Sequence, residues 1–335
     1  MIPKAPRVRI GFIGAGAIAE RHVGTLTRIP QVEIAGFSDV DFERAQGLAS
    51  RVSARAYRSH EDMLQLEGLD AVYICVPPFA HGEPERAVID AGLPFFVEKP
   101  LSLDISTAEA IARSVQDQSM ATAVGYHWRY LDTVEEARTL LRSNPPQLIS
   151  GYWLDRTPPP QWWWREDRSG GQVVEQATHI IDLARYLVGE IVEVCAFTTP
   201  GKPREEFPGL DISTSTAASL RFSAGAVGTL GATCQLRWCH RVGVHLFADG
   251  LAIELSDRDI MVDVGRGRPV RPASEDPVYL EDSDFIDAVR GLSNRVRSPY
   301  SEALKTHRVA LAIAQSARSR RPVSIAEDTL EPARV

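Results

Sequence analysis

Three short motifs, well separated along the chain, combine residue types that suit acid–base and nucleotide chemistry. The pattern G-x-G-x-x-A begins at Gly14 within "RIGFIGAGAIAERH". Lys99 lies in "FFVEKPLSL", directly after an apolar segment, and Glu175 and His179 lie in "SGGQVVEQATHIIDLARYL". A lysine and a histidine beside a carboxylate can exchange protons near neutral pH, and glycine-rich turns bind phosphates through their backbone.

The glycine motif stands in the context that dinucleotide binding requires. It follows the apolar, β-branched segment 8–13 and opens a helix-like segment at 17–27. Gly14 permits a tight turn, Gly16 lets a pyrophosphate approach the backbone, and Ala19 allows close packing of helix and strand. The alternative is a glycine-rich turn that binds no nucleotide.

Asp39 ends the next strand-like segment, where its carboxylate can accept hydrogen bonds from a ribose 2′-hydroxyl and repel a 2′-phosphate. We therefore predict NAD as the cofactor, with NADP possible because Ser38 precedes Asp39. The residues assigned to the cofactor site are Gly14, Gly16, Ala17, Ile18, Ala19, Asp39, Arg44, Pro77, His81, Glu98 and Lys99.

Lys99 follows the strand-like segment 93–97, which is too apolar for a surface edge. Burying an unpaired charge costs several kcal/mol, so we expect Lys99 to emerge in the crevice at the carboxyl end of the strand. Pro100 restricts the chain behind it, and a cis bond is one way to do so. A solvated lysine that caps a strand is the alternative. Pro77 and His81 follow the strand at 70–76 in the same manner, where they either border the crevice or only end the strand and begin a helix.

A single helix over 174–187 would place Glu175, His179 and Asp182 on one face. This arrangement suits proton transfer, and a polar face in water is the alternative. The four cysteines form no C-x-x-C pair, and two ligands on one helix are too few for a metal, so we predict no metal site.

The tryptophan-rich segment 156–171 precedes this helix. An aromatic plane packs on the C–H face of a sugar ring, so Trp164 and Arg165 are candidate substrate ligands, and a purely structural loop is the alternative. The residues assigned to the substrate are Lys99, His127, Arg129, Trp164, Arg165, His179 and Asp182.

The elements that must position these residues fall into two groups. Up to residue 126, short apolar segments alternate with helices of 10 to 15 residues, which indicates βαβ units and a doubly wound parallel sheet. From 127 onward we expect helices at 132–142 and 174–187, then successive strands from 190 to 264. Close strands of this kind indicate a mostly antiparallel sheet and an α+β domain over 127–335. Helices at 284–292 and 301–319 could pack back on the first domain.

Composition excludes several classes of protein. The 335 residues include 44% hydrophobic and 24% charged, which is typical of a soluble globular chain. A net charge of −7 argues against nucleic-acid or anionic-membrane partners. No apolar stretch approaches the roughly 20 residues of a membrane span, and the N-terminal segment has no signal-peptide pattern, so we expect a cytoplasmic protein.

The glycine motif with Asp39, then "EKP" at 98–100, then "GG…E-x-x-x-H-x-x-D" at 170–182, resembles the Gfo/Idh/MocA oxidoreductase family over nearly the whole chain. The resemblance implies a Rossmann domain followed by a domain with a large open sheet that mediates oligomer contacts. It also implies that Lys99 contacts nicotinamide ribose and substrate, and that His179 transfers the proton. Most members place Asp where this chain has Glu175.

The expected function is NAD(H)-dependent hydride transfer at a secondary alcohol or ketone of a sugar, cyclitol or related polyol, with Lys99, His179 and Glu175 as catalytic residues. We expect a homodimer or homotetramer, because few helices are available to cover both faces of the second sheet. Two alternatives are an NAD-retaining enzyme that cleaves a glycosidic bond by transient oxidation, and a ligand-binding regulator without turnover.

Overall fold

The computed structural model describes residues 7–65, 68–201 and 204–325. Within them the chain forms two compact units, and each is described by itself. The first unit extends to Ser102 and adds residues 106–127 and 276–302. The second comprises 103–105, 128–275 and the chain from Ala303 onward.

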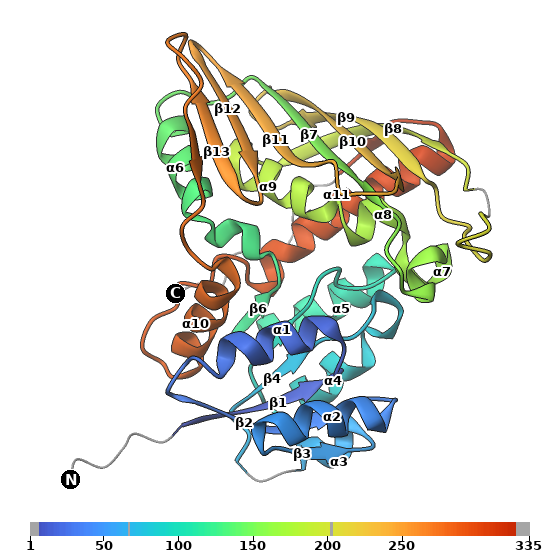
Figure 1. Cartoon of the computed structure of the whole chain (residues 1–335), viewed down its shortest axis with the longest axis vertical. Helices are drawn as coiled ribbons and strands as arrows, with labels where there is room; N and C mark the ends of the chain where they lie inside the picture. Colours follow the sequence, from blue (N-terminus) through green and yellow to red (C-terminus); the bar gives the residue numbers. More distant parts are fainter. Residues whose placement is uncertain (1–6, 66–67, 202–203, 326–335) are drawn as a thin grey trace. The chain divides into compact units, whose positions relative to one another are not determined.

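A six-stranded parallel sheet forms the first unit over the described residues, in the order β3-β2-β1-β4-β5-β6 (Figure 1). The strands are β1 (Val8–Ile13), β2 (Val32–Ser38), β3 (Arg55–Tyr57), β4 (Ala71–Ile74), β5 (Phe95–Val97) and β6 (Thr122–Val124). The order reverses between β1 and β4, which is the doubly wound arrangement predicted from the sequence. Every residue of β4 and β5 is buried, as expected for strands covered on both faces.

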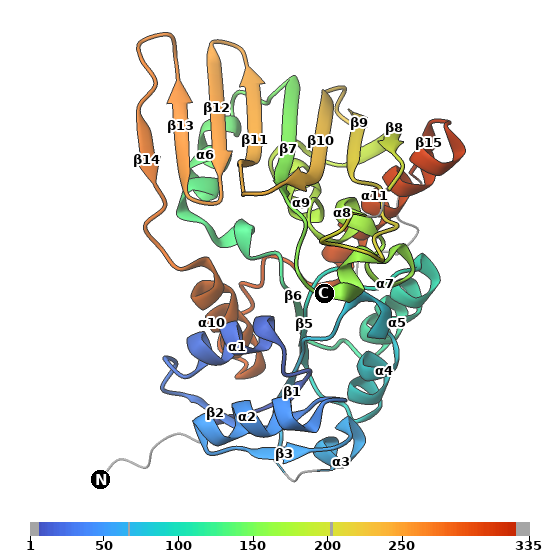
Figure 2. The ribbon, with the colours of Figure 1, turned by 45° about the vertical axis from the view of Figure 1, so that its right-hand side comes forward.

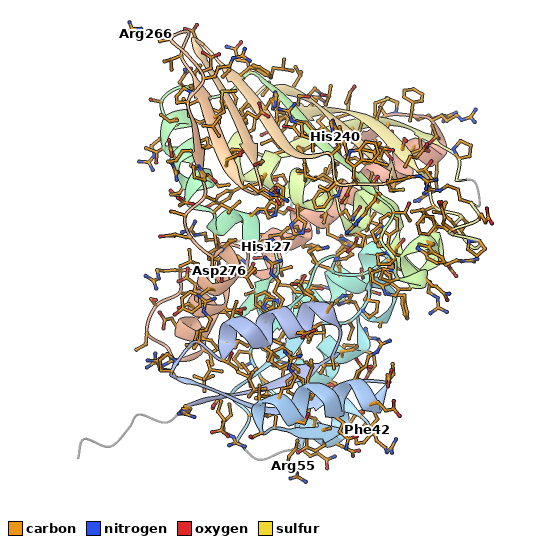
Figure 3. The ribbon with its side chains drawn as sticks, in the orientation of Figure 1. Phe42, Arg55, His127, His240, Arg266 and Asp276 are labelled. Atoms are coloured by element: carbon orange, nitrogen blue, oxygen red, sulfur yellow. The ribbon has the colours of Figure 1, made fainter. Side chains whose placement is uncertain are left out.

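The helices of the first unit are α1 (Ala17–Leu26), α2 (Phe42–Val52), α3 (His60–Leu64), η1 (Pro78–Ala80), α4 (Glu83–Asp90), α5 (Ile105–Asp117) and α10 (Pro277–Val289). The predicted helix 284–292 was therefore placed too late. Asp276 caps α10 by accepting a hydrogen bond from the amide of Tyr279 at 3.3 Å (Figure 3), and Pro277 occupies the first turn. Gly291 lies beyond the end of the helix, at a φ of 68°.

A nine-stranded sheet forms the second unit, again over the described residues, in the order β14-β13-β12-β11-β7-β10-β9-β8-β15 (Figure 2). The strands are β7 (Leu148–Arg156), β8 (Ile191–Thr199), β9 (Ser215–Phe222), β10 (Val227–Leu236), β11 (Arg241–Ala248), β12 (Leu251–Ser256), β13 (Asp259–Asp263), β14 (Val270–Pro272) and β15 (Val323–Ser324). Only β7 and β10 pair in parallel, so the mostly antiparallel sheet is confirmed. The sequence analysis missed β7, which lies between β11 and β10.

The helices of the second unit are η2 (His127–Tyr130), α6 (Asp132–Leu141), η3 (Gln161–Trp164), α7 (Glu166–Ser169), α8 (Gly171–Glu175), α9 (Thr178–Val188) and α11 (Tyr300–Ser319). α6, α9 and α11 share one hydrophobic core with alternate residues of the strands and lie on the same face of the sheet (Figures 1 and 2). Among the described helices, none combines the length and the apolar character that crossing a bilayer demands.

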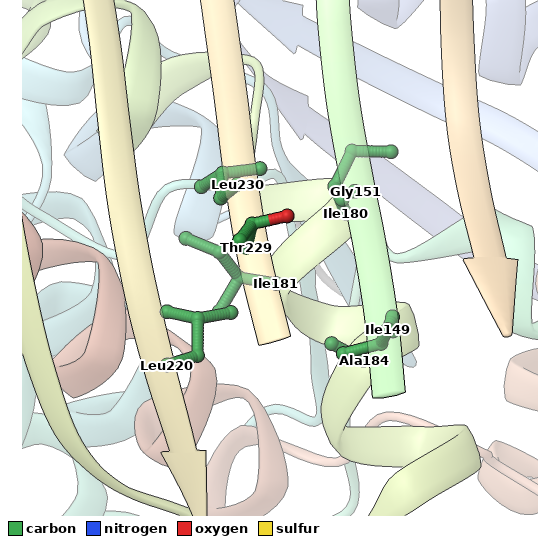
Figure 4. Close-up of a pocket in the computed structure, with 8 residues that line it drawn as sticks. All are labelled: Ile149, Gly151, Ile180, Ile181, Ala184, Leu220, Thr229 and Leu230. Carbon is green, nitrogen blue, oxygen red and sulfur yellow. The ribbon is translucent and has the colours of Figure 1, made fainter. Parts of the chain in front are cut away.

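α9 packs directly against β7 because residue 151 has no side chain. A Cβ on Gly151 would lie 2.5 Å from Cγ2 of Ile180 in α9. A small apolar cavity of about 10 Å³ remains beside this contact (Figure 4). A water molecule needs roughly this space together with polar partners, so the cavity is a packing gap and no substrate pocket.

Gly151→Ala is expected to destabilise the protein by about 1–3 kcal/mol, because the added methyl group forces α9 away from the sheet. The matched control is Gly231→Ala on the neighbouring strand β10, where a Cβ meets no atom within 4 Å. Chemical denaturation followed by tryptophan fluorescence measures both variants. Equal losses of stability would contradict the proposed role of the close contact.

Candidate active site

The glycine-rich turn joins β1 to α1 and presses against the end of β4. Gly14 has a φ of 94°, and a Cβ there would lie 2.3 Å from the carbonyl oxygen of Cys75. A Cβ on Gly16 would meet no atom within 4 Å, so its backbone is open to a ligand. Ala19 is fully buried. The first turn of α1 consists of Ala17, Ile18 and Ala19. An open glycine before the N-terminus of a ten-residue helix suits a pyrophosphate.

Asp39 ties this turn to the end of β2. Its Oδ2 accepts a hydrogen bond from the amide of Ala15 at 2.7 Å, and its Oδ1 accepts one from the amide of Asp41 at 2.8 Å. A carboxylate oxygen can accept a second hydrogen bond, so Asp39 still has capacity for a ribose hydroxyl. Ser38 is turned into the sheet, where its hydroxyl donates to the carbonyl oxygen of Phe12 at 3.4 Å.

Two other residues assigned to the cofactor site pair with carboxylates of the protein. The exposed Arg44 binds Asp41, with 3.1 Å between Nε and Oδ2. His81 lies after η1 and is buried against Glu85, with 2.5 Å between Nδ1 and Oε1. Pro77 precedes η1 in an extended conformation. The turn after β4 is therefore held by a buried His–Glu pair at the start of α4.

Lys99 follows β5, at the same edge of the sheet as the glycine-rich turn. β1, β4 and β5 are parallel neighbours, so their carboxyl ends share this edge. Lys99 is partly exposed, and the Lys99–Pro100 peptide bond is cis. Lys99 thus lies on a turn that follows a fully buried strand, at the sheet edge that carries the glycine-rich turn.

The carboxylate of Glu98 lies in the interior of the unit, where Glu98 is only 6% exposed. Its Oε1 lies 3.1 Å from Nε2 of His22, and its Oε2 accepts a hydrogen bond from the amide of Lys99 at 3.1 Å. Both oxygens are thus engaged by the protein itself.

His127 follows β6 and is the last residue of the segment 106–127 of the first unit (Figure 3). Burial lowers the pKa of its imidazole to about 3, and the positive charges of Arg21, Lys99 and His22 act in the same direction. The imidazole is therefore neutral at physiological pH and can act as a hydrogen-bond partner without carrying charge.

In the second unit, the single helix expected over 174–187 was wrong. α8 ends at Glu175 and α9 begins at Thr178. The carbonyl oxygen of Gln172 accepts from the amides of both Gln176 and Ala177 at 2.9 Å, which widens the turn and changes the helical register. Glu175 and His179 therefore belong to different helices.

Glu175 receives a hydrogen bond from the tryptophan-rich segment. Nε1 of Trp163 donates to Oε2 of Glu175 at 2.6 Å, and Trp163 is 1% exposed. Trp163 also forms a small core with Leu210 and Ile212. The carboxylate therefore anchors this segment to the end of α8.

His179 is held by two tryptophans that sequence reasoning missed. Its ring stacks on Trp128 and on Trp153, with 5.9 Å between ring centroids in each case and interplanar angles of 16° and 19°. Trp128 belongs to η2 and Trp153 to β7. Finding β7 in the sequence would have pointed to Trp153, because its side chain projects from the sheet toward α9.

Arg129 and Asp182 form a buried, bidentate ion pair. Nε and one terminal nitrogen of Arg129 each donate to a different oxygen of Asp182 at 2.7 Å. The two residues are 3% and 1% exposed, and Thr306 donates a further hydrogen bond to Asp182 at 2.8 Å. The pair connects η2, α9 and α11 inside the second unit.

Trp164 and Arg165 lie at the surface of the tryptophan-rich segment. Nε1 of Trp164 donates to the carbonyl oxygen of Pro158 at 2.8 Å, and its ring contacts Phe207 edge-on. The half-exposed Arg165 lies 3.3 Å from Asp211, measured from Nε to Oδ2. Thus the first unit brings together the glycine-rich turn, Asp39 and Lys99, and the second brings together His179, Arg129 and Asp182.

Comparison with known proteins agrees with this architecture. Residues 8–126 match the model of an oxidoreductase family with an NAD-binding Rossmann fold, and residues 145–248 match the C-terminal domain model of the same family. An uncharacterised oxidoreductase of Bacillus subtilis is 26% identical over 94% of this chain and 96% of its own length. A myo-inositol 2-dehydrogenase of Thermotoga maritima is 27% identical over 67% of each chain.

Among solved structures, a levoglucosan dehydrogenase in complex with NADH has a TM-score of 0.87 at 20% identity, covering 96% of this chain and all of that one. This similarity shows the fold. The glycine-rich turn, the doubly wound sheet that carries it, the nine-stranded sheet of the second unit and the two matching domain models lead to one conclusion: the chain belongs to the Gfo/Idh/MocA family of NAD-binding oxidoreductases.

Proposed function

We propose that this protein is an NAD(H)-dependent dehydrogenase that acts on a secondary alcohol or ketone of a sugar, cyclitol or related polyol. The observation that carries the proposal is the position of Lys99, on the turn after a fully buried strand and at the sheet edge that holds the glycine-rich turn. The inositol dehydrogenases among the relatives support the substrate class.

The first unit would hold the cofactor through its backbone. The open amides at Gly16 and at the start of α1 would bind the pyrophosphate, and the free acceptor capacity of Asp39 would bind the adenosine ribose. A carboxylate at this position favours NAD over NADP. NAD, when bound, supplies the hydride acceptor for alcohol oxidation.

Lys99 and His179 would act on the substrate hydroxyl. The Lys99 ammonium would donate a hydrogen bond to the substrate oxygen, and the His179 imidazole would accept the hydroxyl proton during oxidation. Contact with both indoles, whose own centroids are 6.0 Å apart, restricts the rotation of the His179 ring. Reduction uses the same groups in reverse.

We propose supporting roles for three residues that the sequence analysis assigned to catalysis or to substrate binding. We assign Glu175 to anchoring Trp163, because its carboxylate accepts the indole hydrogen bond. Arg129 and Asp182 would hold η2 and α9 together, because both are buried in a mutual ion pair. Trp164 and Arg165, which are more accessible, remain candidates for substrate contact.

We further propose that the face of the nine-stranded sheet opposite α6, α9 and α11 mediates self-association into a dimer or tetramer. Leu148 of β7 lies opposite Val227 of β10 and Phe247 of β11, and these side chains are 43%, 50% and 37% exposed. Three adjacent exposed apolar residues on a flat sheet are typical of a buried interface.

Incubation with NAD and a panel of myo-inositol, scyllo-inositol, D-xylose and levoglucosan should reveal at least one substrate by absorbance of the reduced nicotinamide. Lys99→Ala and His179→Ala should each lower kcat by roughly 10²- to 10⁴-fold. Lys305→Ala and His240→Ala serve as controls of the same residue types. If the protein binds NAD but no polyol in the panel reduces it, the result would instead favour the glycosidase or the regulator alternative.

Substitutions at two glycines of the same turn separate folding from cofactor binding. Gly14→Ala should destabilise the first unit, because its Cβ would overlap the carbonyl of Cys75 at a positive φ. Gly16→Ala should leave the melting temperature unchanged and weaken NADH binding at least tenfold, because its Cβ faces only the ligand space. NADH fluorescence and thermal melting provide the measurements, and full binding by a folded Gly16→Ala variant would exclude the assigned pyrophosphate site.

Phe247→Asp should reduce the oligomer to a smaller species, because an uncompensated charge would be buried in the interface. Leu292→Asp, at an exposed apolar residue of the first unit, is the control. Light scattering after size-exclusion chromatography gives the mass of each variant. An unchanged mass for Phe247→Asp would place the interface elsewhere.

A further inference from the structure

A buried polar cluster in the first unit connects Lys99 to α10. His22 of α1 lies between two carboxylates, with 2.8 Å from its Nδ1 to Oδ1 of Asp282 and 3.1 Å from its Nε2 to Oε1 of Glu98. The three residues are 1%, 0% and 6% exposed. His22 and Asp282 are 260 residues apart in the chain, so only the fold brings them together.

Asp282 is held from three sides. Besides His22, the hydroxyl of Thr25 donates to its Oδ2, and the hydroxyl of Tyr73 donates to its Oδ1 at 3.2 Å. Tyr73 itself stacks on Phe96 of β5. The carboxylate of Asp282 therefore has one orientation, which residues of α1 and β4 define by hydrogen bonds to it.

The charges of the cluster are complementary. Burial lowers the pKa of His22, but the charges and hydrogen bonds of Asp282 and Glu98 outweigh this effect and raise the pKa to about 10. The imidazole therefore carries a positive charge between two carboxylates at neutral pH.

Several other titratable groups surround the cluster. Burial, with the charges of nearby carboxylates, raises the pKa of Glu281, of Cys75 and of Tyr73, which favours the neutral form of each group. Arg21, Lys99 and the neutral His127 also lie near it.

Glu98 connects the cluster to the turn that carries Lys99. Its Oε1 is bound by His22 and its Oε2 by the amide of Lys99. The carboxylate also lies against the backbone of Gly125, where a Cβ would come within 2.5 Å of Oε1. The carboxylate is therefore fixed on both oxygens and on one side.

A buried ionic group of this kind contributes little net stability compared with apolar residues of the same volume. It does define orientation, because only one arrangement satisfies every donor and acceptor in a low-dielectric interior. A turn whose lysine must reach a reacting oxygen within a few tenths of an ångström requires such support.

We propose that Asp282 and His22 are positioning residues for Lys99: through the carboxylate of Glu98 they hold the turn after β5 in a single orientation. This inference rests on the role of Lys99 in the proposed function. It also explains why the glutamate precedes the lysine in the "EKP" motif.

The test compares Asp282→Asn with Asp276→Asn in the full chain. Both substitutions remove one carboxylate charge in or next to α10. Asp282 pairs with buried His22, whereas Asp276 pairs at the surface with Arg28, with 2.7 Å between Oδ2 and a terminal guanidinium nitrogen. A general loosening of α10 would affect both variants.

The primary readout is residue-resolved hydrogen exchange at the amide of Lys99, with the amide of Phe95 in β5 as the internal reference. Asp282→Asn should accelerate exchange at Lys99 roughly tenfold to a hundredfold relative to Phe95, because a charge-assisted hydrogen bond is loosened. Asp276→Asn should leave this ratio unchanged. Equal acceleration at both amides in Asp282→Asn, or none at Lys99, would overturn the proposal.

Glu98→Gln provides the second variant, because it keeps the shape of the side chain and removes its charge. The same selective acceleration at Lys99 is expected. If neither variant folds, the wild-type protein still provides a test. The NMR chemical shifts of the ring nitrogens of His22 are followed in a pH titration. The imidazole should stay mostly protonated as the pH rises and should titrate with a pKa of about 10. Titration of His22 near 6.5 would show that the charged cluster does not exist.

The raised pKa also predicts the pH dependence of stability. A group that is protonated more readily in the folded state stabilises the protein fully below its unfolded pKa of about 6.5, and this contribution is lost as pH rises through the folded value. Unfolding of the wild type should therefore become easier from about pH 6.5 to pH 10. Glu98→Gln should show a weaker dependence over this range, and an identical dependence would contradict the assignment.

None of these measurements needs a substrate, so the two proposals fail separately. Suppose that Lys99→Ala keeps full turnover while Asp282→Asn accelerates exchange at the Lys99 amide. The proposed catalytic role of Lys99 would then be wrong, and the inference that the cluster orients the turn would still hold. For a polyol that reduces NAD, Asp282→Asn should lower kcat about tenfold to a hundredfold, with the Kd for NADH unchanged. A lower kcat explained wholly by weaker NADH binding would overturn the inference.

Discussion

Burial on both faces of the six-stranded parallel sheet is the constraint on which the NAD-binding unit depends. β4 and β5 lie entirely in the interior, so charged side chains are excluded from their length and appear only where the strands end. The strands are parallel, so their carboxyl ends meet at one edge. The glycine-rich turn, Asp39 and Lys99 all occupy that edge as a consequence.

Two buried ionic groups are fully paired and hydrogen-bonded. In the first unit His22 lies between Glu98 and Asp282, and in the second unit Arg129 binds Asp182 with two parallel hydrogen bonds. Each group joins elements that are remote in sequence. Apolar packing alone tolerates small shifts of one element on another, whereas a satisfied ionic group permits one arrangement. Both units therefore place ionic groups next to their proposed reactive residues.

Much of the fold could be predicted, because the spacing of apolar residues and the sequence around a motif are local properties of the chain. The alternation of apolar segments and helices indicated the parallel sheet, and the residues around Gly14 indicated an NAD-binding turn. β7 was missed because its strand status depends on β11 and β10 on either side, and Gly151 interrupts its apolar pattern. α10 was placed seven residues late because its cap, Asp276, precedes the strongest apolar periodicity.

The candidate site shows the same division. Residue types and order alone determined that Gly14, Gly16 and Asp39 can serve a dinucleotide and that Lys99 follows a buried strand. Tertiary structure decided which partners each polar side chain has. Glu175 and His179 belong to different helices because the Gln172 carbonyl accepts two amides. Glu98 is buried because His22 of α1, which also binds Asp282 of α10, lies within hydrogen-bond distance of its carboxylate. A helical face follows from a fixed angle per residue, whereas the partner of a buried charge depends on elements that only the folded chain brings within hydrogen-bond distance.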